Sequence, residues 1–288
     1  MSRLSIRHAA IGAVVVLAAV ACGSGSSNKT AAPSRPRASA PSQTPTSAAA
    51  MPLPPGAENM KVAITSPADG TKVTDNAVTV RVSTSGYDDT CDLAGKPVLN
   101  ATSGHYHVLI DKSLVNMYCT PEATVSMQNV KPGTHKLTVV PTLNDHAEVE
   151  ENAQSITIDY EPTNPLPAIT DATETGTPSI KILSPKPGDV VSGAFDVTVQ
   201  ITSFHPDCDL MGKPGVVGYG HWHLNADSST GPMQGMGTMF GMSCANVFHA
   251  TTTGFKSGET HSLIALLTDN SHAPLSPPIE DKVDVKIG

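Results

Sequence analysis

The stretch Gly104-His105-Tyr106-His107 decides how this chain is organised, because it occurs again as Gly220-His221-Trp222-His223. Each copy follows a segment of the form Cys-Asp-Leu-x-Gly-Lys-Pro, which begins at Cys91 in one case and at Cys208 in the other. A second cysteine, a His-x-Leu pair and a last histidine then follow in the same order in both copies. Repeated spacing of this kind indicates two tandem domains of one family.

Short segments with alternating apolar residues surround this stretch. In the first copy they predict strands at 60–66, 78–82, 105–110, 135–140 and 155–158, with equivalents in the second copy. Turns rich in Gly, Pro, Asn and Asp separate them, and no segment combines the periodicity and the length of a helix. The sequence therefore predicts an all-β chain with two tandem immunoglobulin-like antiparallel β-sandwiches.

Composition places the boundaries of these sandwiches at 59–160 and 178–288. Between them, residues 161–177 are rich in Pro and Thr and are predicted to form a linker. Each sandwich has roughly 100 to 110 residues, which is enough for a core of its own. Residues 22–58 are mostly Ser, Ala, Pro and Thr, and such a segment buries too little apolar surface to fold, so we expect a disordered tether.

The opening of each sandwich reads Ile-x-Ser-Pro-x-x-Gly, from Ile64 and from Ile182. This pattern resembles many bacterial immunoglobulin-like modules. The Gly-His-x-His strand with its later histidines resembles, more narrowly, a family of uncharacterised exported bacterial immunoglobulin-like domains. The resemblance covers residues 60–160 and 178–288 and implies the fold, but it implies no activity.

The N-terminus has the features of an export signal. Arg3 and Arg7 precede an apolar run from Ala9 to Val20, which is too short for a membrane span. Ala19-Val20-Ala21-Cys22 is similar to the lipobox of bacterial lipoproteins. We therefore expect a signal peptide at residues 1–21, lipidation of Cys22, and a chain anchored on the extracytoplasmic face of the cell membrane. A plain signal peptide with a free Cys22 is the alternative.

The chain has five cysteines, an odd number that flags one unpaired thiol in an exported protein. Without Cys22, two cysteines remain at matching places in each copy. An oxidising exterior favours disulfides over thiolate ligands. We predict the pairs Cys91 with Cys119 and Cys208 with Cys244.

The formal net charge of the chain is −8. Residues 1–21 contain two arginines and no acidic residue, so the processed chain is near −10. No basic patch indicates a nucleic-acid partner, or peripheral binding to an anionic lipid surface.

The repeated histidines are candidates for metal ligands. Residues two apart on a strand point to the same side, so the pair in each Gly-His-x-His projects together. Imidazole is the usual ligand of zinc and copper. A third ligand is expected from the adjacent strand and a fourth from the loop that follows it. The candidates are His105, His107, His135 and His146 in the first copy and His221, His223, His261 and His272 in the second.

A purely structural role for these histidines stands beside the metal hypothesis. Tyr106, Val108 and Ile110 alternate with the histidine pair and are expected to face the core. The histidines then lie on the outer face or under a loop, where they can hydrogen-bond to the backbone. His135 has the parity of Leu137, which places it at the mouth of the core.

A methionine-rich insertion distinguishes the second copy. From His223 to Cys244 there are 21 residues (244 − 223), against 12 from His107 to Cys119 (119 − 107). Glycines and a proline in the insertion argue against a stable helix. Thioethers select Cu(I), so a copper site is expected in this domain, whereas an apolar loop that packs on the sandwich or on a partner is the alternative. The residues are Met233, Met236, Met239 and Met242, with Met117 aligned to Met242 and with Met211 and His249 as possible additions.

Together these features predict a surface-anchored lipoprotein that binds a transition metal, copper before zinc. A non-catalytic surface module that binds a protein or cell-wall glycan is the alternative. We expect no enzyme. A His-x-His strand on such a sandwich is similar to copper/zinc superoxide dismutase, but the zinc loop of that family is missing. No arrangement suited to a hydrolase is present, and Asp92 and Asp209 are expected to cap turns.

Overall fold

The computed structural model describes residues 53–97, 100–173 and 176–288, with the backbone alone at 232–234. The predicted signal peptide, the lipidation site Cys22 and most of the predicted tether lie outside these residues. Among the described residues, no helix is long and apolar enough to cross a membrane. From Leu53 onward the chain packs on the first sandwich, where the short 3-10 helix η1 (Ala57–Asn59) buries Ala57.

The first sandwich is made of two sheets, with strand orders β1-β3-β7 and β2-β9-β8-β5-β4, and β6 also pairs with β5, on the edge opposite β8. Most pairs are antiparallel, whereas β2 with β9 and β4 with β5 are parallel. The strands are β1 Lys61–Ser66, β2 Thr71–Val73, β3 Ala77–Ser85, β4 Asp88–Asp89, β5 Ser103–Ile110, β6 Ser113–Tyr118, β7 Glu122–Ser126, β8 Gly133–Thr142 and β9 Gln154–Tyr160, with a 3-10 turn η2 at Glu150–Asn152.

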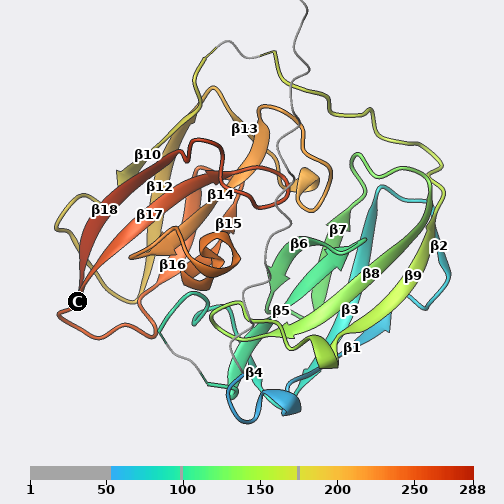
Figure 1. Ribbon diagram of the computed structural model, residues 1–288, viewed down its shortest axis with the longest axis horizontal. Coiled ribbons are helices and arrows are strands. Elements are labelled where there is room, and N and C mark those ends of the chain that lie inside the picture. Colours follow the sequence, from blue (N-terminus) through green and yellow to red (C-terminus); the bar gives the residue numbers. More distant parts are fainter. Residues whose placement is uncertain (1–52, 98–99, 174–175) are drawn as a thin grey trace, which may run out of the picture. The chain divides into compact units, whose positions relative to one another are not determined.

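The second sandwich repeats this topology strand for strand, with orders β10-β12-β16 and β11-β18-β17-β14-β13, and β15 beside β14 (Figure 1). Its strands are β10 Ser179–Ser184, β11 Val190–Val191, β12 Ala194–Thr202, β13 His205–Pro206, β14 Tyr219–Ala226, β15 Met239–Ser243, β16 Val247–Thr251, β17 Thr260–Thr268 and β18 Glu280–Ile287, with 3-10 helices η3 at Cys208–Leu210 and η4 at Pro232–Thr238.

Each pair of sheets encloses its own apolar core, which confirms the two tandem immunoglobulin-like sandwiches. Tyr106 and Trp222 occupy the same place on β5 and β14, and both are fully buried at 0% exposure. Their polar atoms find carbonyl acceptors, from the Tyr106 hydroxyl to Thr120 and from the Trp222 indole to Ala245. The five predicted strands are present as β1, β3, β5, β8 and β9, and the four further strands β2, β4, β6 and β7 lie where we predicted none.

The two predicted disulfides are confirmed. Cys91 bonds to Cys119 and Cys208 to Cys244, each with Cα atoms 5.6 Å apart. In each sandwich the bond ties the segment before β5 or β14 to the end of the hairpin that follows. Each disulfide therefore fixes the surroundings of a Gly-His-x-His strand.

The predicted linker is bonded to both sandwiches. The side-chain nitrogen Nδ2 of Asn129 donates to the backbone carbonyl of Ile169, and the backbone amide of Ile169 donates to Oδ1 of Asn129. Further on, the Ala172 amide donates to the carbonyl of Val217. The two sandwiches belong to one compact unit.

Candidate metal centre

Strand β5 places His105 and His107 on one face of the larger sheet. The alternate residues Tyr106 and Val108 point into the core at 0% exposure, as their alternation predicts. His105 and His107 are just as buried, at 0% and 1% exposure. This face is therefore covered, and the histidines lie under a loop rather than on an open surface.

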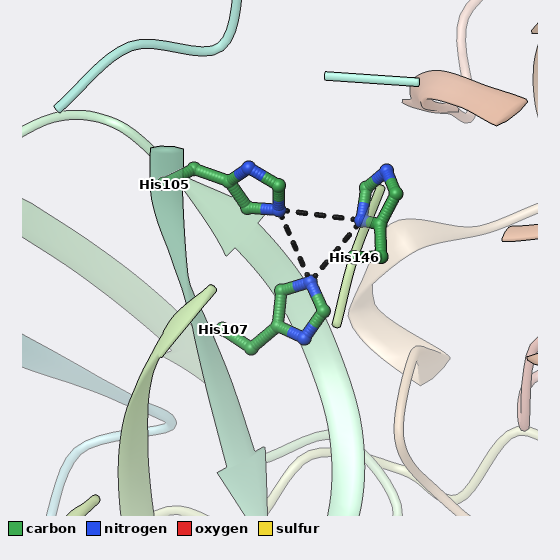
Figure 2. A group of neighbouring side chains, drawn as sticks. All are labelled: His105, His107 and His146. Carbon is green, nitrogen blue, oxygen red and sulfur yellow. Dashed lines mark hydrogen bonds between the residues drawn. The ribbon is translucent and has the colours of Figure 1, made fainter. Parts of the chain in front are cut away.

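The loop after β8 brings a third imidazole to this face. His146 has a φ of 64°, in the left-handed region that residues other than glycine rarely adopt. Its Nδ1 lies 3.2 Å from Nε2 of His105 and 3.3 Å from Nε2 of His107, and those two Nε2 atoms are 3.2 Å apart. Figure 2 shows the three nitrogens turned toward a common point. We call this group triad 1.

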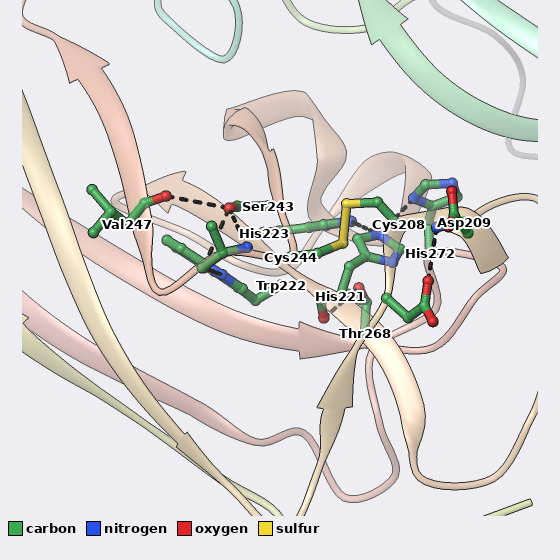
Figure 3. The surroundings of a disulfide bond; sticks show 12 residues. Cys208, Asp209, His221, Trp222, His223, Ser243, Cys244, Val247, Thr268 and His272 are labelled. Atoms are coloured by element: carbon green, nitrogen blue, oxygen red, sulfur yellow. Dashed lines mark hydrogen bonds between the residues drawn. A yellow bond between two sulfur atoms is a disulfide. The ribbon is translucent and has the colours of Figure 1, made fainter. Parts of the chain in front are cut away.

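The second sandwich contains the equivalent group, which we call triad 2. His272 has a φ of 67°, and its Nδ1 lies 2.9 Å from Nε2 of His221. The Nε2 atoms of His221 and His223 are 3.0 Å apart. Figure 3 shows the three rings beside the disulfide Cys208–Cys244. Both triads bring ligand atoms within 4.8 Å of one another.

The nitrogen separations suit one metal ion in each triad. With metal–nitrogen bonds of about 2.0–2.1 Å and tetrahedral angles, imidazole nitrogens lie about 3.3 Å apart. The nitrogens of triad 1 are separated by 3.2, 3.2 and 3.3 Å. Triad 2 is slightly tighter, at 3.0 and 2.9 Å, and has to open by a few tenths of an ångström.

The outer partners of the rings fix which nitrogen carries the proton. Nε2 of His146 is 2.8 Å from the carbonyl oxygen of Met239, which can only accept, so this nitrogen donates. Nδ1 of His107 lies 2.7 Å from the Glu148 carboxylate and donates to it. Both rings, when neutral, therefore turn a lone pair toward the centre of triad 1. Nε2 of His272 donates in the same way to the carbonyl of Leu114, at 2.8 Å.

Burial disfavours the charged form of several triad rings. It lowers the pKa of His105 well below its usual value, and the charges of His146 and His107 lower it further. Burial is also the main cause that lowers the pKa of His146 to about 3 and that of His272 to about 4. Neutral imidazole is the form that binds a metal ion, so protons do not compete for His105, His146 and His272 near pH 7.

The two triads also act on each other electrostatically. The pKa of His223 is lowered first by burial, then by the charge of His272 in the same triad, and then by the charge of His146 in the other triad. In the same way His107 contributes to lowering the pKa of His272. A positive charge in one triad therefore disfavours protonation in the other.

The structure corrects the expectation that His135 and His261 supply the third ligands. In the register of β5 with β8, Ile110 pairs with Leu137, so His135 lies past the far end of β5. Its Nδ1 is 2.6 Å from Asp111 and its Nε2 is 2.8 Å from the carbonyl of Lys131. His261 has the matching place, with Nδ1 2.7 Å from Asp227. The loop residues His146 and His272 take the third position.

The methionine-rich segment is more ordered than we predicted. Residues 232–238 form the 3-10 helix η4, where we expected no helix. Its three residues per turn leave every third residue on one side. Met239 is fully buried, and Met236 and Met242 pack with it against Met117. Met233 is the other methionine that we predicted as a ligand in this segment, and the structure describes only its backbone.

The register confirms the predicted equivalence of Met117 and Met242. Met117 pairs with His107 across β5 and β6, and Met242 pairs with His223 across β14 and β15. Directly paired residues share a face of the sheet, with Cβ atoms about 4.5–5.5 Å apart. One thioether therefore lies beside each triad. His249 is elsewhere, on β16, where it is bonded to Asp196 at 2.6 Å.

Three partners of the triads were not predicted from the sequence. Glu148 follows His146 by two residues, and a carboxylate so close to a candidate ligand was an available signal. The carbonyl groups of Leu114 and Met239 gave no signal, because a backbone oxygen is present at every position. The expected turn caps also differ, since Thr90 and Asp207 accept from the amides of Asp92 and Asp209.

No family model matches this chain, and no curated protein matches it. Among solved structures, it resembles fibronectin(III)-like modules of Clostridium thermocellum CbhA, with 14% identity over 78% of this chain and 93% of that chain and a TM-score of 0.25. A putative membrane anchored protein from Corynebacterium diphtheriae is 8% identical over 80% of this chain and 59% of that chain, with a TM-score of 0.25. At these scores the strand order within each sandwich remains the basis of the fold assignment.

Proposed function

We propose that this chain is a membrane-anchored, extracytoplasmic protein that binds one transition metal ion in each immunoglobulin-like sandwich. The observation that carries the proposal is the pair of matched histidine triads. In triad 1, His107 and His146 turn lone pairs toward the same buried point, 3.3 Å apart. Buried lone pairs that face each other need a proton or a cation between them. We assign binding, and no catalytic step, to this arrangement.

The neighbouring thioethers favour copper over zinc. Met117 and Met242 are the cross-strand partners of His107 and His223. Zinc prefers nitrogen, thiolate and carboxylate ligands, whereas thioether sulfur is a soft ligand that selects Cu(I). Three imidazoles with an adjacent thioether are therefore better suited to copper, and zinc is the second candidate. Buffering or delivery of the ion outside the cytoplasm is the role that we propose.

Metal titration of the processed chain tests this function. We expect about two ions per chain, measured with Cu(I), Cu(II) and Zn(II) against a competing chelator. The double change His221→Ala with His223→Ala should remove one ion, and the matched change His105→Ala with His107→Ala should remove the other. His261→Ala is the control, because this histidine lies outside the triads. The proposal would be refuted if the wild-type chain is folded and still binds no metal ion.

Anchoring through Cys22 is a separate part of the proposal. It is supported by the lipobox-like Ala19-Val20-Ala21-Cys22 and by the segment 22–58 that follows, which is rich in Ser, Ala, Pro and Thr. The change Cys22→Ser should release the chain from the membrane fraction into the soluble exported fraction. Retention of the Cys22→Ser chain on membranes would mean that another feature holds it there.

A second candidate function is a non-catalytic surface recognition module whose histidines are structural. Its support is that no ring of the triads is more than 4% exposed, and that His146 and His272 bond to backbone carbonyls. In that case the histidine changes lower the free energy of unfolding without any effect on metal content. Thermal unfolding measured with and without metal separates the two candidates.

A further inference from the structure

Two equivalent hydrogen bonds join the sandwiches, one donated by each sandwich to the other. Nε2 of His146 in the first sandwich donates to the carbonyl of Met239 in the second, at 2.8 Å. Nε2 of His272 in the second donates to the carbonyl of Leu114 in the first, also at 2.8 Å. Met239 and Leu114 are equivalent positions, since each lies three residues before the methionine that pairs with a triad (242 − 239 and 117 − 114).

Two glycines of the repeated Cys-Asp-Leu-x-Gly-Lys-Pro segment make these contacts possible. Gly95 has a φ of +68°, and a Cβ built on it would lie 2.4 Å from the carbonyl oxygen of Met239. Gly212 has a φ of +73°, and its Cβ would lie 2.7 Å from the carbonyl oxygen of Leu114. Only glycine permits this approach of one backbone to the other. The repeated segment therefore serves the contact between the sandwiches.

A buried lysine next to Gly95 adds to the contact. Nζ of Lys96 donates to the carbonyls of Thr251 and Thr253 in the second sandwich, at 2.6 and 3.0 Å. It also lies over the rings of Phe240 and Phe255, 4.4 and 4.8 Å from their centroids. A buried ammonium group without such partners would be costly, so the second sandwich both buries Lys96 and supplies two of its acceptors, beside the carbonyl of Asp92 at 3.3 Å.

We propose that each triad is completed by the opposite sandwich, so that metal binding and docking of the two sandwiches are coupled. This inference rests on the proposed metal function. The carbonyl groups of Met239 and Leu114 act as positioning groups, because they hold the third ligand of each triad in the tautomer and orientation that present Nδ1 to the ion. Neither carbonyl touches the ion itself.

The physical reason is the loss of these acceptors on separation. When the sandwiches part, Nε2 of His146 and of His272 faces water, and nothing holds either ring against rotation or the other tautomer. Loss of such an outer partner typically costs about 10- to 100-fold in metal affinity. Coupling is reciprocal, so a bound ion stabilises the docked arrangement by the same factor.

Glycine substitutions in the processed full chain test the coupling. Gly95→Ala should weaken the binding of Zn(II) or Cu(I) to triad 1 by about 10- to 100-fold, and Gly212→Ala should do the same to triad 2. Affinity and stoichiometry are measured by chelator competition. The matched controls are Gly70→Ala and Gly188→Ala, because these glycines have φ of +73° and +83° with nothing within 4 Å of the added Cβ. The controls carry the same backbone strain without the clash.

A second measurement on the wild-type chain does not depend on the folding of any variant. Bound Zn(II) should slow amide hydrogen exchange in the contact segments 93–97 and 250–254, relative to the distant strand β1. Unchanged exchange there with both triads loaded, or equal metal affinity of Gly95→Ala and Gly70→Ala, would overturn the coupling and leave the proposed function standing. A wild-type chain without metal affinity would overturn both.

Discussion

His105 differs from the other rings of triad 1, because no described residue bonds to its Nδ1. Without metal, its Nε2 must carry the proton that lies between the lone pairs of His107 and His146. An ion at the centre displaces that proton, and a neutral His105 then carries its proton on Nδ1.

We therefore predict that metal binding changes the tautomer of His105. Nitrogen-15 NMR of histidine-labelled protein should show a protonated Nε2 without metal and an unprotonated, metal-bound Nε2 with Zn(II). His135, which is bonded to Asp111 away from the triads, is the internal control. Bound metal with unchanged His105 signals would contradict this prediction.

Glu148 makes triad 1 differ from triad 2. Its carboxylate accepts from Nδ1 of His107 at 2.7 Å, and the equivalent position in the second sandwich is Pro274, as the bridges from Thr142 and Thr268 show. A carboxylate partner raises the basicity of a ligating imidazole. The two sites are therefore chemically different although their ligands are the same.

We predict that Glu148→Gln lowers the metal affinity of triad 1 by about tenfold and leaves triad 2 unchanged. Isothermal titration calorimetry of wild-type and variant chains, each with triad 2 removed by the His221→Ala and His223→Ala changes, isolates the effect. Glu150→Gln, on the exposed turn η2, is the control. Equal affinities of the Glu148→Gln and Glu150→Gln chains would mean that Glu148 does not support His107.

The hairpins β5–β6 and β14–β15 each carry a histidine opposite a methionine. If the thioethers of Met117 and Met242 take part in binding, Met117→Leu and Met242→Leu should weaken Cu(I) binding by about tenfold or more, equivalent to about 1.4 kcal/mol. Zn(II) binding should be unaffected, because zinc has little preference for thioether sulfur. Competition titrations with both metals check this.

Met127→Leu is the matched control for this change. Met127 is fully buried in the first core, away from the triads, so its replacement affects packing alone. If Met117→Leu and Met242→Leu weaken Cu(I) and Zn(II) binding equally, these side chains support the triads only by packing.

The buried lysines give the whole molecule a distinctive dependence on alkaline pH. Burial lowers the pKa of both Lys96 and Lys213 from 10.5 to about 8. Below pH 8 both lysines are charged in the folded and unfolded chain. Between about 8 and 10.5 the unfolded chain binds more protons, so the free energy of unfolding rises with pH.

We predict that this rise is at most about 1.4 kcal/mol per pH unit for each lysine. Urea unfolding of the metal-free chain at pH 7.5 and 9.5 measures it, and the double change Lys96→Met with Lys213→Met should flatten the difference. A wild-type free energy of unfolding that falls over this interval would contradict the assignment.

The alternation of residues within strands and the internal repeat of the sequence were enough to predict the fold, the core-facing residues and the disulfides. Alternation on β5 and β14 fixed which side chains face the core, because successive side chains on a strand point to opposite faces. The matched cysteines gave both disulfides, and duplication of the whole frame gave two sandwiches of one topology. The same step of 11 residues leads from His135 to His146 and from His261 to His272 (146 − 135 and 272 − 261). It marked the two loop histidines as candidates, though not as the third ligands.

Tertiary structure alone decided which histidines meet and what covers them. His135 shares a strand with the residues opposite triad 1, yet the register carries it past the end of β5, and register is a property of paired strands rather than of one sequence. The carbonyls of Met239 and Leu114 complete the triads from the opposite sandwich. The sequence does not show which carbonyls these are, because backbone oxygens are chemically identical at every residue and only the packing of the two sandwiches selects these two.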